Sequence, residues 1–569
     1  MNVLTKTILF VFTILNHTAG FSQRYDFNWV FGYDGGKGDP RFGTTVLNFN
    51  SGNPKASYIS QGKLDISIAN AAISDENGNL LYYTNGYDVE DFNFSKVLGA
   101  TNLGIKYWNG LVSNQGVLFL PDPKNDSLYY LFYINLVLNS PNFYATDMKY
   151  LVINKYYNKT IFKGTMLHDT INEGCLTACK HANGRDYWIL LNKANSNLFY
   201  KYLLTDSGIV FTNKQEIGPK VIEGVGQAVF SNNGEYFGLL DAIDFRQGLY
   251  IKIYKFNRCD GNIDFLKLSN YPTSSLSGIS FSPNSRYFYY SEYKYLYQVD
   301  MQNLQSFEFP NLIDTIESQT LPWGSQYFMH QLGPDGRIYI SNAYNNFVIH
   351  VINKPNELEN KCLPKSNSFA LNTLGGKGIP NMPNYRLGPI DGSSCDTLGI
   401  DNIPWAWWRH DQDTTDYLNF EFTDLSAYEV TDWEWSFGDG MVSTLQNPLH
   451  RYSQKGVYEV CLIAKNKNGV DTLCKTLNVG TTSTKNDQDQ IKIEILPNPC
   501  KEYFIVNVLD YNPEKMHLKL FDLNGELILS QRLFEGSNGI ELKLIPSGFY
   551  FIKIIEKGSL VRSEKLMKI

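Results

Sequence analysis

Between Gly226 and Gly336 the chain repeats one pattern of apolar and polar positions three times. The copies read GQAVFSNNGEYFGLL, SGISFSPNSRYFYYSE and HQLGPDGRIYISNA. In each copy a short apolar strand leads into a tight polar turn, and an aromatic strand follows. The turns centre on Gly234, Ser285 and Gly336, which lie 51 residues apart. A fixed period of about 50 residues, built from short strands, predicts a β-propeller.

Three earlier segments carry the same kind of turn. They centre on Asn77–Gly78, Lys124–Asp126 and Asn183–Gly184. Asn-Gly pairs favour the positive φ angles of tight hairpins. At this period, residues 23–390 hold about seven repeat units, and the seventh has no intact copy. We expect that unit to be shared between Phe27–Phe49 and Ser368–Tyr385, since joining the two ends leaves no open sheet edge.

The pattern changes after residue 390. Residues 391–400 are small and polar and predict a linker. In residues 401–480, Trp433, Trp435 and Phe437 alternate with polar neighbours, which predicts a strand with these three side chains on one face. Residues 481–490 are polar and predict a second linker. Residues 491–569 then show short, evenly spaced strands with turns at Asn498–Pro499, Asn524–Gly525, Asn538–Gly539 and Lys557–Gly558.

Residues 1–22 have the features of a secretory signal peptide. Lys6 precedes an apolar run from Ile8 to Leu15, and small residues follow at Gly20 and Ser22. A membrane anchor is the alternative, but the run is far shorter than the ~20 residues of a spanning helix. We therefore expect an exported, soluble chain whose eight cysteines lie in a compartment that permits disulfides.

Several of these motifs resemble known families. The segments EGCLTACKHANGRDYW, FSPNSRYFYYS, QLGPDGRIYISNA and GIPNMPNY resemble a family of secreted bacterial propellers. The segments DWEWSFGDG and HRYSQKGVYEV resemble a PKD domain, an immunoglobulin-like sandwich. This resemblance implies that Trp435 lies in the core of that domain. The order ILPNP, LKLFDLNGELI, IPSGFYFIKI and KLMKI resembles the C-terminal sorting domain of type IX secretion.

These resemblances imply an all-β protein: a seven-bladed propeller at 23–390, a PKD sandwich at 401–480 and a small sandwich at 491–569. They imply that the type IX machinery is a partner of residues 491–569. The cargo would then be released, or attached to the outer surface of a Gram-negative cell. The resemblance carries over no catalytic residue.

Composition narrows the classes of partner. The chain has 50 Lys and Arg against 57 Asp and Glu, a net charge of -7. This balance gives no electrostatic support for binding nucleic acid or an anionic membrane.

Two histidines are candidates for acid–base chemistry. His181 and Asp186 share one predicted hairpin and are a conceivable catalytic pair. His330 stands before the Gly336 turn in a similar position. We favour structural hydrogen bonding for all three, because they fall where the repeat itself needs a turn.

We expect neither a metal nor a cofactor. Cys175 and Cys179 lack the further ligands of a zinc site. The glycine-rich stretch around Lys37 lacks the spacing of a phosphate-binding loop. Asp439, in the predicted PKD turn, is a weak candidate for a calcium ligand.

The cysteines at 461 and 474 are expected to form a disulfide. They are placed symmetrically about a predicted turn at Lys467 and Asn468, so they face each other across a hairpin. Two buried free thiols are the alternative. The pairing of the other six is left open: Cys175, Cys179, Cys259, Cys362, Cys395 and Cys500.

The function that these features favour is non-enzymatic binding of a glycan or a protein. Aromatic residues crowd one blade, at Tyr289, Tyr290, Tyr293, Tyr295 and Tyr297. Any that point outward would offer flat contact surface, whereas the alternative is that they pack between blades. A propeller-based polysaccharide hydrolase or lyase is the second hypothesis, since fold does not fix function. A structural spacer is the third.

Overall fold

The protein is described by a computed structural model. The described residues are 23–33, 35, 39, 41–59, 62–106, 110–139, 142–221, 225–242, 248–271, 277–316, 324–375, 377–480, 492–496, 500–509, 516–523, 525–534, 536–556 and 559–568. The expected signal peptide at 1–22 and the expected linker at 481–490 lie outside them.

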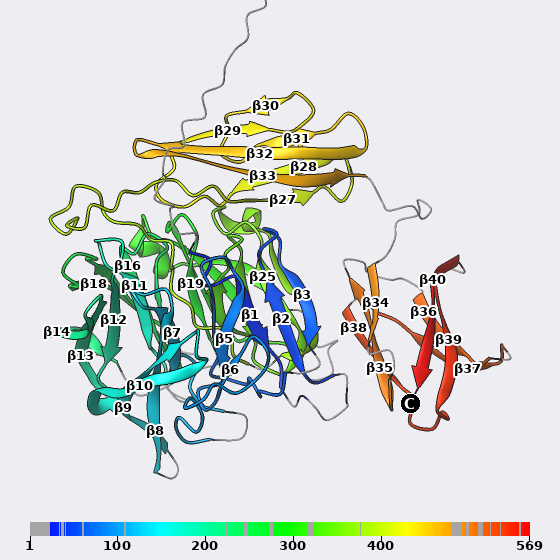
Figure 1. Ribbon diagram of the computed structural model, residues 1–569, viewed down its shortest axis with the longest axis horizontal. Coiled ribbons are helices and arrows are strands. Elements are labelled where there is room, and N and C mark those ends of the chain that lie inside the picture. Colours follow the sequence, from blue (N-terminus) through cyan, green and yellow to red (C-terminus); the bar gives the residue numbers. More distant parts are fainter. Residues whose placement is uncertain are drawn as a thin grey trace, which may run out of the picture.

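The described part of residues 23–390 forms seven antiparallel sheets arranged as a propeller (Figure 1). The first three blades contain β1 (Asn28–Phe31), β2 (Thr44–Asn48) and β3 (Lys55–Ile59); β4 (Ala71–Ser74), β5 (Leu80–Thr84) and β6 (Val89–Asp91); and β7 (Val117–Pro121), β8 (Leu128–Asn139), β9 (Asn142–Asn154) and β10 (Lys159–Ile171).

The remaining four blades have four strands each, in chain order within each sheet. They contain β11 (Thr177–Lys180), β12 (Tyr187–Asn192), β13 (Ser196–Thr205) and β14 (Gly208–Val221); β15 (Val225–Phe230), β16 (Tyr236–Ala242), β17 (Leu249–Phe256) and β18 (Ile263–Tyr271); β19 (Ile279–Phe281), β20 (Tyr287–Glu292), β21 (Tyr295–Asp300) and β22 (Asn311–Thr315); and β23 (Tyr327–Leu332), β24 (Ile338–Asn342), β25 (Asn346–Ile352) and β26 (Pro364–Gly375). Two short 3-10 helices, η1 (Leu304–Phe307) and η2 (Glu359–Cys362), lie in the last two blades.

Each predicted repeat turn joins the first and second strands of a blade, from the second blade to the seventh. The turns of the second, fourth, fifth and seventh blades each have a glycine with a positive φ, 73° at Gly234 and 78° at Gly336 for example, and Ser285 of the sixth blade takes 59° at the same place. This conformation favours residues without a Cβ, which is why glycine recurs there. The first blade has no such turn, because residues 32–43 form a longer connection between β1 and β2.

The expected sharing of one sheet between the two ends of the propeller is wrong. Strands β1, β2 and β3 form the first blade by themselves, while β26 is the outer strand of the seventh. The chain supplies β3 locally, so no strand from the far end is needed. The two blades meet through packing, a backbone hydrogen bond from Leu374 N to Arg41 O of 2.8 Å, and a bond between the hydroxyls of Thr45 and Thr373 of 2.8 Å.

Two sheets after the propeller form the immunoglobulin-like sandwich. One holds β27 (Trp408–Gln412), β28 (Asn419–Asp424) and β31 (Leu449–Arg451); the other holds β29 (Asp432–Ser436), β30 (Val442–Ser443), β32 (Gly456–Asn466) and β33 (Gly469–Val479). The prediction that Trp435 lies in its core is confirmed, since the side chain is fully buried beside Trp408 and Phe422.

The last domain is a second small sandwich, beside the propeller in Figure 1. It holds β34 (Lys492–Leu496), β35 (Tyr503–Leu509) and β38 (Gly536–Glu541) against β36 (Met516–Phe521), β37 (Leu527–Arg532), β39 (Gly548–Glu556) and β40 (Ser559–Lys568). The expected turn at Asn538–Gly539 is wrong. Both residues lie inside β38 and pair with Val506 and Ile505, because strand pairing prevails over the local turn preference.

The PKD sandwich rests on the propeller face that carries the hairpin turns, as Figure 1 shows. The Arg24 guanidinium of the propeller lies 4.5 Å from the ring centre of Trp407 of the sandwich, and Lys475 Nζ of the sandwich donates to Ser51 O of the propeller at 3.4 Å. Arg337 of the propeller is ion-paired with Asp411 of the sandwich. Cation–π and ionic contacts of this kind fix one domain on the other. The described residues include no helix that is both long and apolar enough to span a membrane.

Candidate functional site

A cavity of about 470 Å³ lies between the turn-bearing face of the propeller and the PKD sandwich. Its propeller wall comes from the hairpin turns of the fifth, sixth and seventh blades. The segment that leaves the propeller, residues 381–389, crosses one side, and PKD residues 424–429 with Gln446 form the opposite wall. Ligand pockets occur preferentially at such domain junctions, and their usual volumes of about 300–1,000 Å³ include the volume of this cavity.

Hydrogen bonds join the turns of neighbouring blades along the propeller wall. Asn232 Nδ2 donates to Pro283 O at 2.8 Å, and the backbone N of Asn233 donates to Ser285 Oγ at 3.0 Å. The backbone N of Asn284 donates in turn to Asn356 Oδ1 at 2.9 Å. The wall is therefore preformed and rigid.

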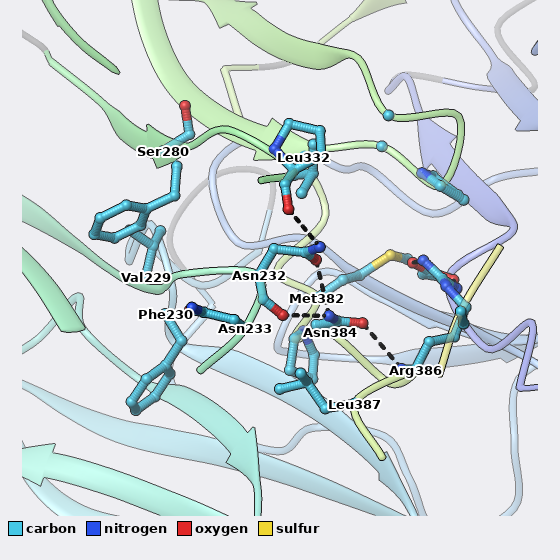
Figure 2. A pocket seen from close by; sticks show the side chains of 18 of the residues that line it. Val229, Phe230, Asn232, Asn233, Ser280, Leu332, Met382, Asn384, Arg386 and Leu387 are labelled. Atoms are coloured by element: carbon cyan, nitrogen blue, oxygen red, sulfur yellow. Dashed lines mark hydrogen bonds and ion pairs between the residues drawn. The ribbon is translucent and has the colours of Figure 1, made fainter. Parts of the chain in front are cut away.

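The crossing segment is anchored to the centre of the propeller. Asn381 Nδ2 donates to the carbonyls of Val117 at 2.8 Å and Leu176 at 2.9 Å, in two adjacent blades. Further along, Asn384 Nδ2 donates to the carbonyl of Asn232 at 2.8 Å, which draws the segment onto the turn wall (Figure 2). Sequence reasoning quoted this segment only as a family motif and missed its part in the site.

The cations at the cavity are already engaged. Arg386 forms a buried bidentate ion pair with Asp26, with Nη2 2.8 Å from Oδ2. Arg258 donates to the carbonyls of Lys180, His181 and Gly388. Burial lowers the pKa of Arg258. These side chains hold the walls together, and the described lining contains no other Lys or Arg.

The PKD wall contributes carboxyl and hydroxyl groups. Asp424 accepts hydrogen bonds from Trp433 Nε1 at 2.7 Å, Gln446 Nε2 at 3.1 Å and the backbone N of Ser426 at 3.0 Å. Burial raises the pKa of Asp424. Burial likewise raises the pKa of Tyr428 to about 12, so its hydroxyl stays protonated. Glu429 is exposed at the rim.

His330, one sequence candidate, is among the residues that line this cavity, and its side chain is fully buried. Its Nδ1 lies 3.1 Å from Ser280 Oγ and its Nε2 lies 3.0 Å from Ser291 Oγ. Burial, with a smaller contribution from His350, lowers the pKa of His330 to about 3. The ring is neutral at physiological pH, and both of its nitrogens are engaged in the core.

His181 and Asp186 have no side-chain contact with each other among the described hydrogen bonds. His181 Nδ1 accepts from the backbone N of Asn183 at 3.0 Å, and Nε2 lies 2.9 Å from the carbonyl of Cys259. Asp186 accepts from Arg185 Nε at 2.7 Å and from Asn183 Nδ2 at 2.8 Å. Both side chains thus serve their own hairpin and its neighbour.

Cysteines fall into two groups. Cys461 and Cys474 lie directly opposite each other on β32 and β33 and are joined by a disulfide. A second disulfide, whose pairing the sequence left open, joins Cys259 of the propeller to Cys395 of the segment 391–400. The four remaining cysteines are buried free thiols: Cys175, Cys179, Cys362 and Cys500. Burial raises the pKa of Cys179 to about 12, far from the range of a reactive thiolate.

The described side chains include no group of three or more His, Cys, Asp or Glu placed to hold a metal ion. Asp439 instead accepts from His450 Nε2 at 2.8 Å, and the His450 ring stacks on Phe437. Lys37 lies outside the described residues.

The tyrosines of the sixth blade pack mainly between blades. Tyr289 and Tyr290 are buried, and the ring of Tyr290 stacks on Tyr271 of the fifth blade with centres 4.9 Å apart. Of the five tyrosines in this group, Tyr293 is the exposed one, at 40%. They do not form a broad exposed aromatic surface.

Comparison with known families identifies the two C-terminal domains. Residues 404–480 match the model of the PKD domain, and residues 494–568 match that of the secretion system C-terminal sorting domain. Among curated proteins, the chain is similar to two Bacillus cereus collagenases, ColQ1 (40% identity over 48 residues) and ColA (30% over 84 residues). It spans only 5% and 7% of their lengths, respectively, and 8% and 15% of its own.

Solved structures include the PKD1 domain of the Vibrio cholerae metalloprotease PrtV, at 25% identity and a TM-score of 0.13. That match covers 14% of this chain and 99% of the PKD1 domain. The β-propeller domain of Myceliophteria thermophila Swd1 matches at 9% identity and a TM-score of 0.33, covering 57% of this chain and 91% of that one. Scores this low support no further argument.

The sorting domain indicates a protein that is secreted or displayed at the cell surface, and its presence implies contact with the secretion machinery. The sheets of the N-terminal part are those of a propeller, and the PKD match covers the sandwich that lies on it. The chain is therefore a seven-bladed β-propeller protein with a PKD domain and a C-terminal sorting domain of the type IX secretion kind.

Proposed function

We propose that this protein acts outside a Gram-negative cell as a non-enzymatic binding protein, and that its ligand occupies the cavity between the propeller and the PKD sandwich. The observation that carries the proposal is the cavity itself. It has a preformed wall of linked turns, and its two arginines already donate to groups of the protein. Such a site offers shape and neutral polar groups for binding.

Acid–base catalysis requires two titratable groups with separated pKa values at one place. His330 is sealed in the core, and His181 and Asp186 are held within their hairpin. The contacts of these three residues therefore favour a structural role over a catalytic one.

One observation favours the second candidate, a polysaccharide hydrolase or lyase. Asp424, with a raised pKa, and Glu429, exposed at the rim, both line the cavity. Glycosidases use a pair of carboxyl groups that flank the scissile bond, and the pKa of the general acid is raised. Against it, both oxygens of Asp424 already accept hydrogen bonds.

An array of glycans and surface proteins, probed with the full-length chain, tests the binding proposal. Asn233→Trp places a large side chain at the cavity, while Asn125→Trp makes the same change at the matching turn of the third blade, away from it. We expect Asn233→Trp to abolish binding and Asn125→Trp to retain it. Equal binding by both variants would overturn the cavity as the site.

Product analysis on each bound glycan separates binding from catalysis. We expect intact glycan after incubation. New chain ends that disappear with Asp424→Asn or Glu429→Gln, with the circular dichroism spectrum unchanged, would replace the binding proposal with the hydrolase or lyase.

A further inference from the structure

We propose that the ligand of this cavity is an uncharged oligosaccharide, held by amide groups of the propeller turns and by the PKD wall. This inference rests on the proposed function of the cavity as a binding site. It concerns the class of ligand and makes a prediction that the general binding proposal does not.

The charges on the lining argue against an ionic ligand. Arg386 is neutralised by Asp26, and Arg258 is committed to three backbone carbonyls. An anion would meet arginines whose hydrogen-bond donors are already engaged, beside the exposed carboxylate of Glu429. Burying a charge without a hydrogen-bonded partner is costly. A cation would find the Asp26 and Asp424 carboxylates already hydrogen-bonded, and Glu429 is the remaining carboxylate, at the solvent-exposed rim.

Free hydrogen-bonding groups on the lining fit hydroxyls. The side-chain Oδ1 of Asn233 and of Asn284 accepts from the backbone two residues on, whereas Nδ2 donates to no described residue. A hydroxyl oxygen accepts as well as donates, so a sugar can accept from these free amide N–H groups.

Apolar side chains complete the site. Figure 2 shows Val229, Phe230, Leu332, Met382 and Leu387 around the same space as the asparagines. A sugar ring has a face of C–H groups as well as its hydroxyls. Apolar contact on one side and amide contact on the other therefore suit a saccharide.

A peptide ligand is disfavoured, because backbone groups at the inner strand edges of the propeller already have hydrogen-bond partners. Peptides commonly bind by adding a strand to a free sheet edge. Here Gln227 donates to His330 O at 2.7 Å and accepts from Ile279 N at 2.9 Å. Gln115 makes the same two contacts with the carbonyl and the N–H of Ala228, at 3.0 and 2.6 Å. Glutamine side chains thus occupy the edges that a peptide would need.

Calorimetric titration of the full-length chain tests the inference. The neutral probes are maltotriose, cellotriose, mannotriose, xylotriose and N,N′,N″-triacetylchitotriose. The charged probe is trigalacturonate, and the peptide probe is acetyl-trialanine amide. We expect at least one neutral trisaccharide to bind, and trigalacturonate to bind at least tenfold more weakly.

The double variant Asn233→Asp with Asn284→Asp removes both Nδ2 donors and keeps both Oδ1 acceptors. The turn tolerates aspartate, since Asp335 fills this position in the seventh blade, with Oδ1 accepting from Arg337 N. We expect affinity for the neutral probe to fall at least tenfold. Asn125→Asp, the same exchange in the third blade, is the matched control and should leave affinity unchanged.

The outcomes separate the two proposals. If trigalacturonate or the peptide binds, loses binding with Asn233→Trp, and no neutral probe binds, the cavity is a ligand site and the saccharide inference is wrong. Equal losses in the double variant and in Asn125→Asp would also overturn it. If no probe binds, the saccharide inference fails, and the array decides the cavity proposal independently.

Discussion

Buried polar side chains close the axis of the propeller. Gln115, Gln227 and Asn381 satisfy backbone groups of the innermost strands that have no neighbouring strand to pair with. An unpaired buried backbone group costs about as much as a lost hydrogen bond. At the scale of single residues, these amides hold the blades in fixed relation and make the cavity wall rigid.

His330 should make the propeller sensitive to acid. Its pKa is about 3 in the folded protein and about 6.5 when unfolded, so between these values the unfolded state holds one more proton. The free energy of unfolding therefore falls as pH drops from 6.5 to 3, by about 1.4 kcal/mol per pH unit from this group. Above pH 6.5 the group has no effect.

Urea unfolding of the wild type and of His330→Gln, followed by tryptophan fluorescence between pH 7 and 4, measures this effect. The free energy of unfolding of the variant should fall less steeply with decreasing pH. The difference in slope should correspond to about one bound proton. Parallel curves for the two proteins would show that His330 is not held neutral.

Gly234 should be intolerant of alanine for two reasons. Its φ is +73°, and an added Cβ would lie 2.6 Å from Arg258 Cδ and 3.0 Å from Cys179 Sγ. Gly208, at +102° in the β13–β14 hairpin, has nothing within 4 Å. We expect Gly208→Ala to cost about 1–2 kcal/mol from backbone strain alone, and Gly234→Ala to cost a further ~1–3 kcal/mol from overpacking. Denaturant unfolding of both checks the difference, and equal losses would contradict it.

At the scale of elements, one disulfide cross-links the β32–β33 hairpin, and another ties the β17–β18 hairpin to the segment 391–400. The β32–β33 hairpin carries its disulfide between residues 13 apart in sequence. The second disulfide fastens the segment 391–400 to the propeller, so that segment is held on the cavity side. Asn402 strengthens the hold, since its Nδ2 donates to Pro389 O at 3.0 Å and Asp391 Oδ1 at 2.9 Å.

Thiol labelling of the full chain, denatured and unreduced, should modify four of its eight cysteines. Peptide mapping is expected to find label on the free thiols Cys175, Cys179, Cys362 and Cys500. Cys259, Cys395, Cys461 and Cys474 should remain unlabelled until a reductant is added. Label on both Cys461 and Cys474 without reductant would exclude that bridge. Removing it is expected to cost about 3 kcal/mol, the value for a loop of ~15 residues.

At the scale of the whole molecule, the PKD sandwich is fixed to the propeller by side-chain contacts. The Arg24 guanidinium of the propeller lies on Trp407 near the start of the sandwich, and Lys354 of the propeller is ion-paired with Glu421 of the sandwich. The two domains therefore shape one cavity between them. The sorting domain shares no sheet with either, in keeping with a separate role in export.

The mature protein should lack both ends of the chain. Signal peptidase is expected to remove residues 1–22, and the sorting domain should be cut off within 481–490, since exposed polar segments are the usual sites of proteolysis. Intact-mass measurement of the exported protein, with peptide mapping, checks both. A tryptic peptide containing Phe549 in the mature chain would count against removal of the sorting domain.

The sequence by itself determined the elements and their order. Strand alternation and the turns at Gly234, Ser285 and Gly336 are local signals: a positive φ demands a small or turn-forming residue, and a two-residue period marks a strand with one buried face. The same alternation placed Trp433, Trp435 and Phe437 on one face of a strand, and the resemblance to a PKD domain placed Trp435 in the core. These properties depend on neighbours within a few positions, so one sequence is enough to read them.

Only the tertiary structure decided which distant residues meet. The Cys259–Cys395 bond spans 136 positions, and Asn381 reaches carbonyls more than 200 residues away. No periodicity encodes such contacts, because they arise when blades close into a ring and the exit segment crosses it. The burial of Tyr290 and of His330 was likewise fixed by neighbouring blades. The cavity exists because two domains pack against each other. That packing depends on surfaces built from residues distant in sequence, and the local sequence pattern does not encode it.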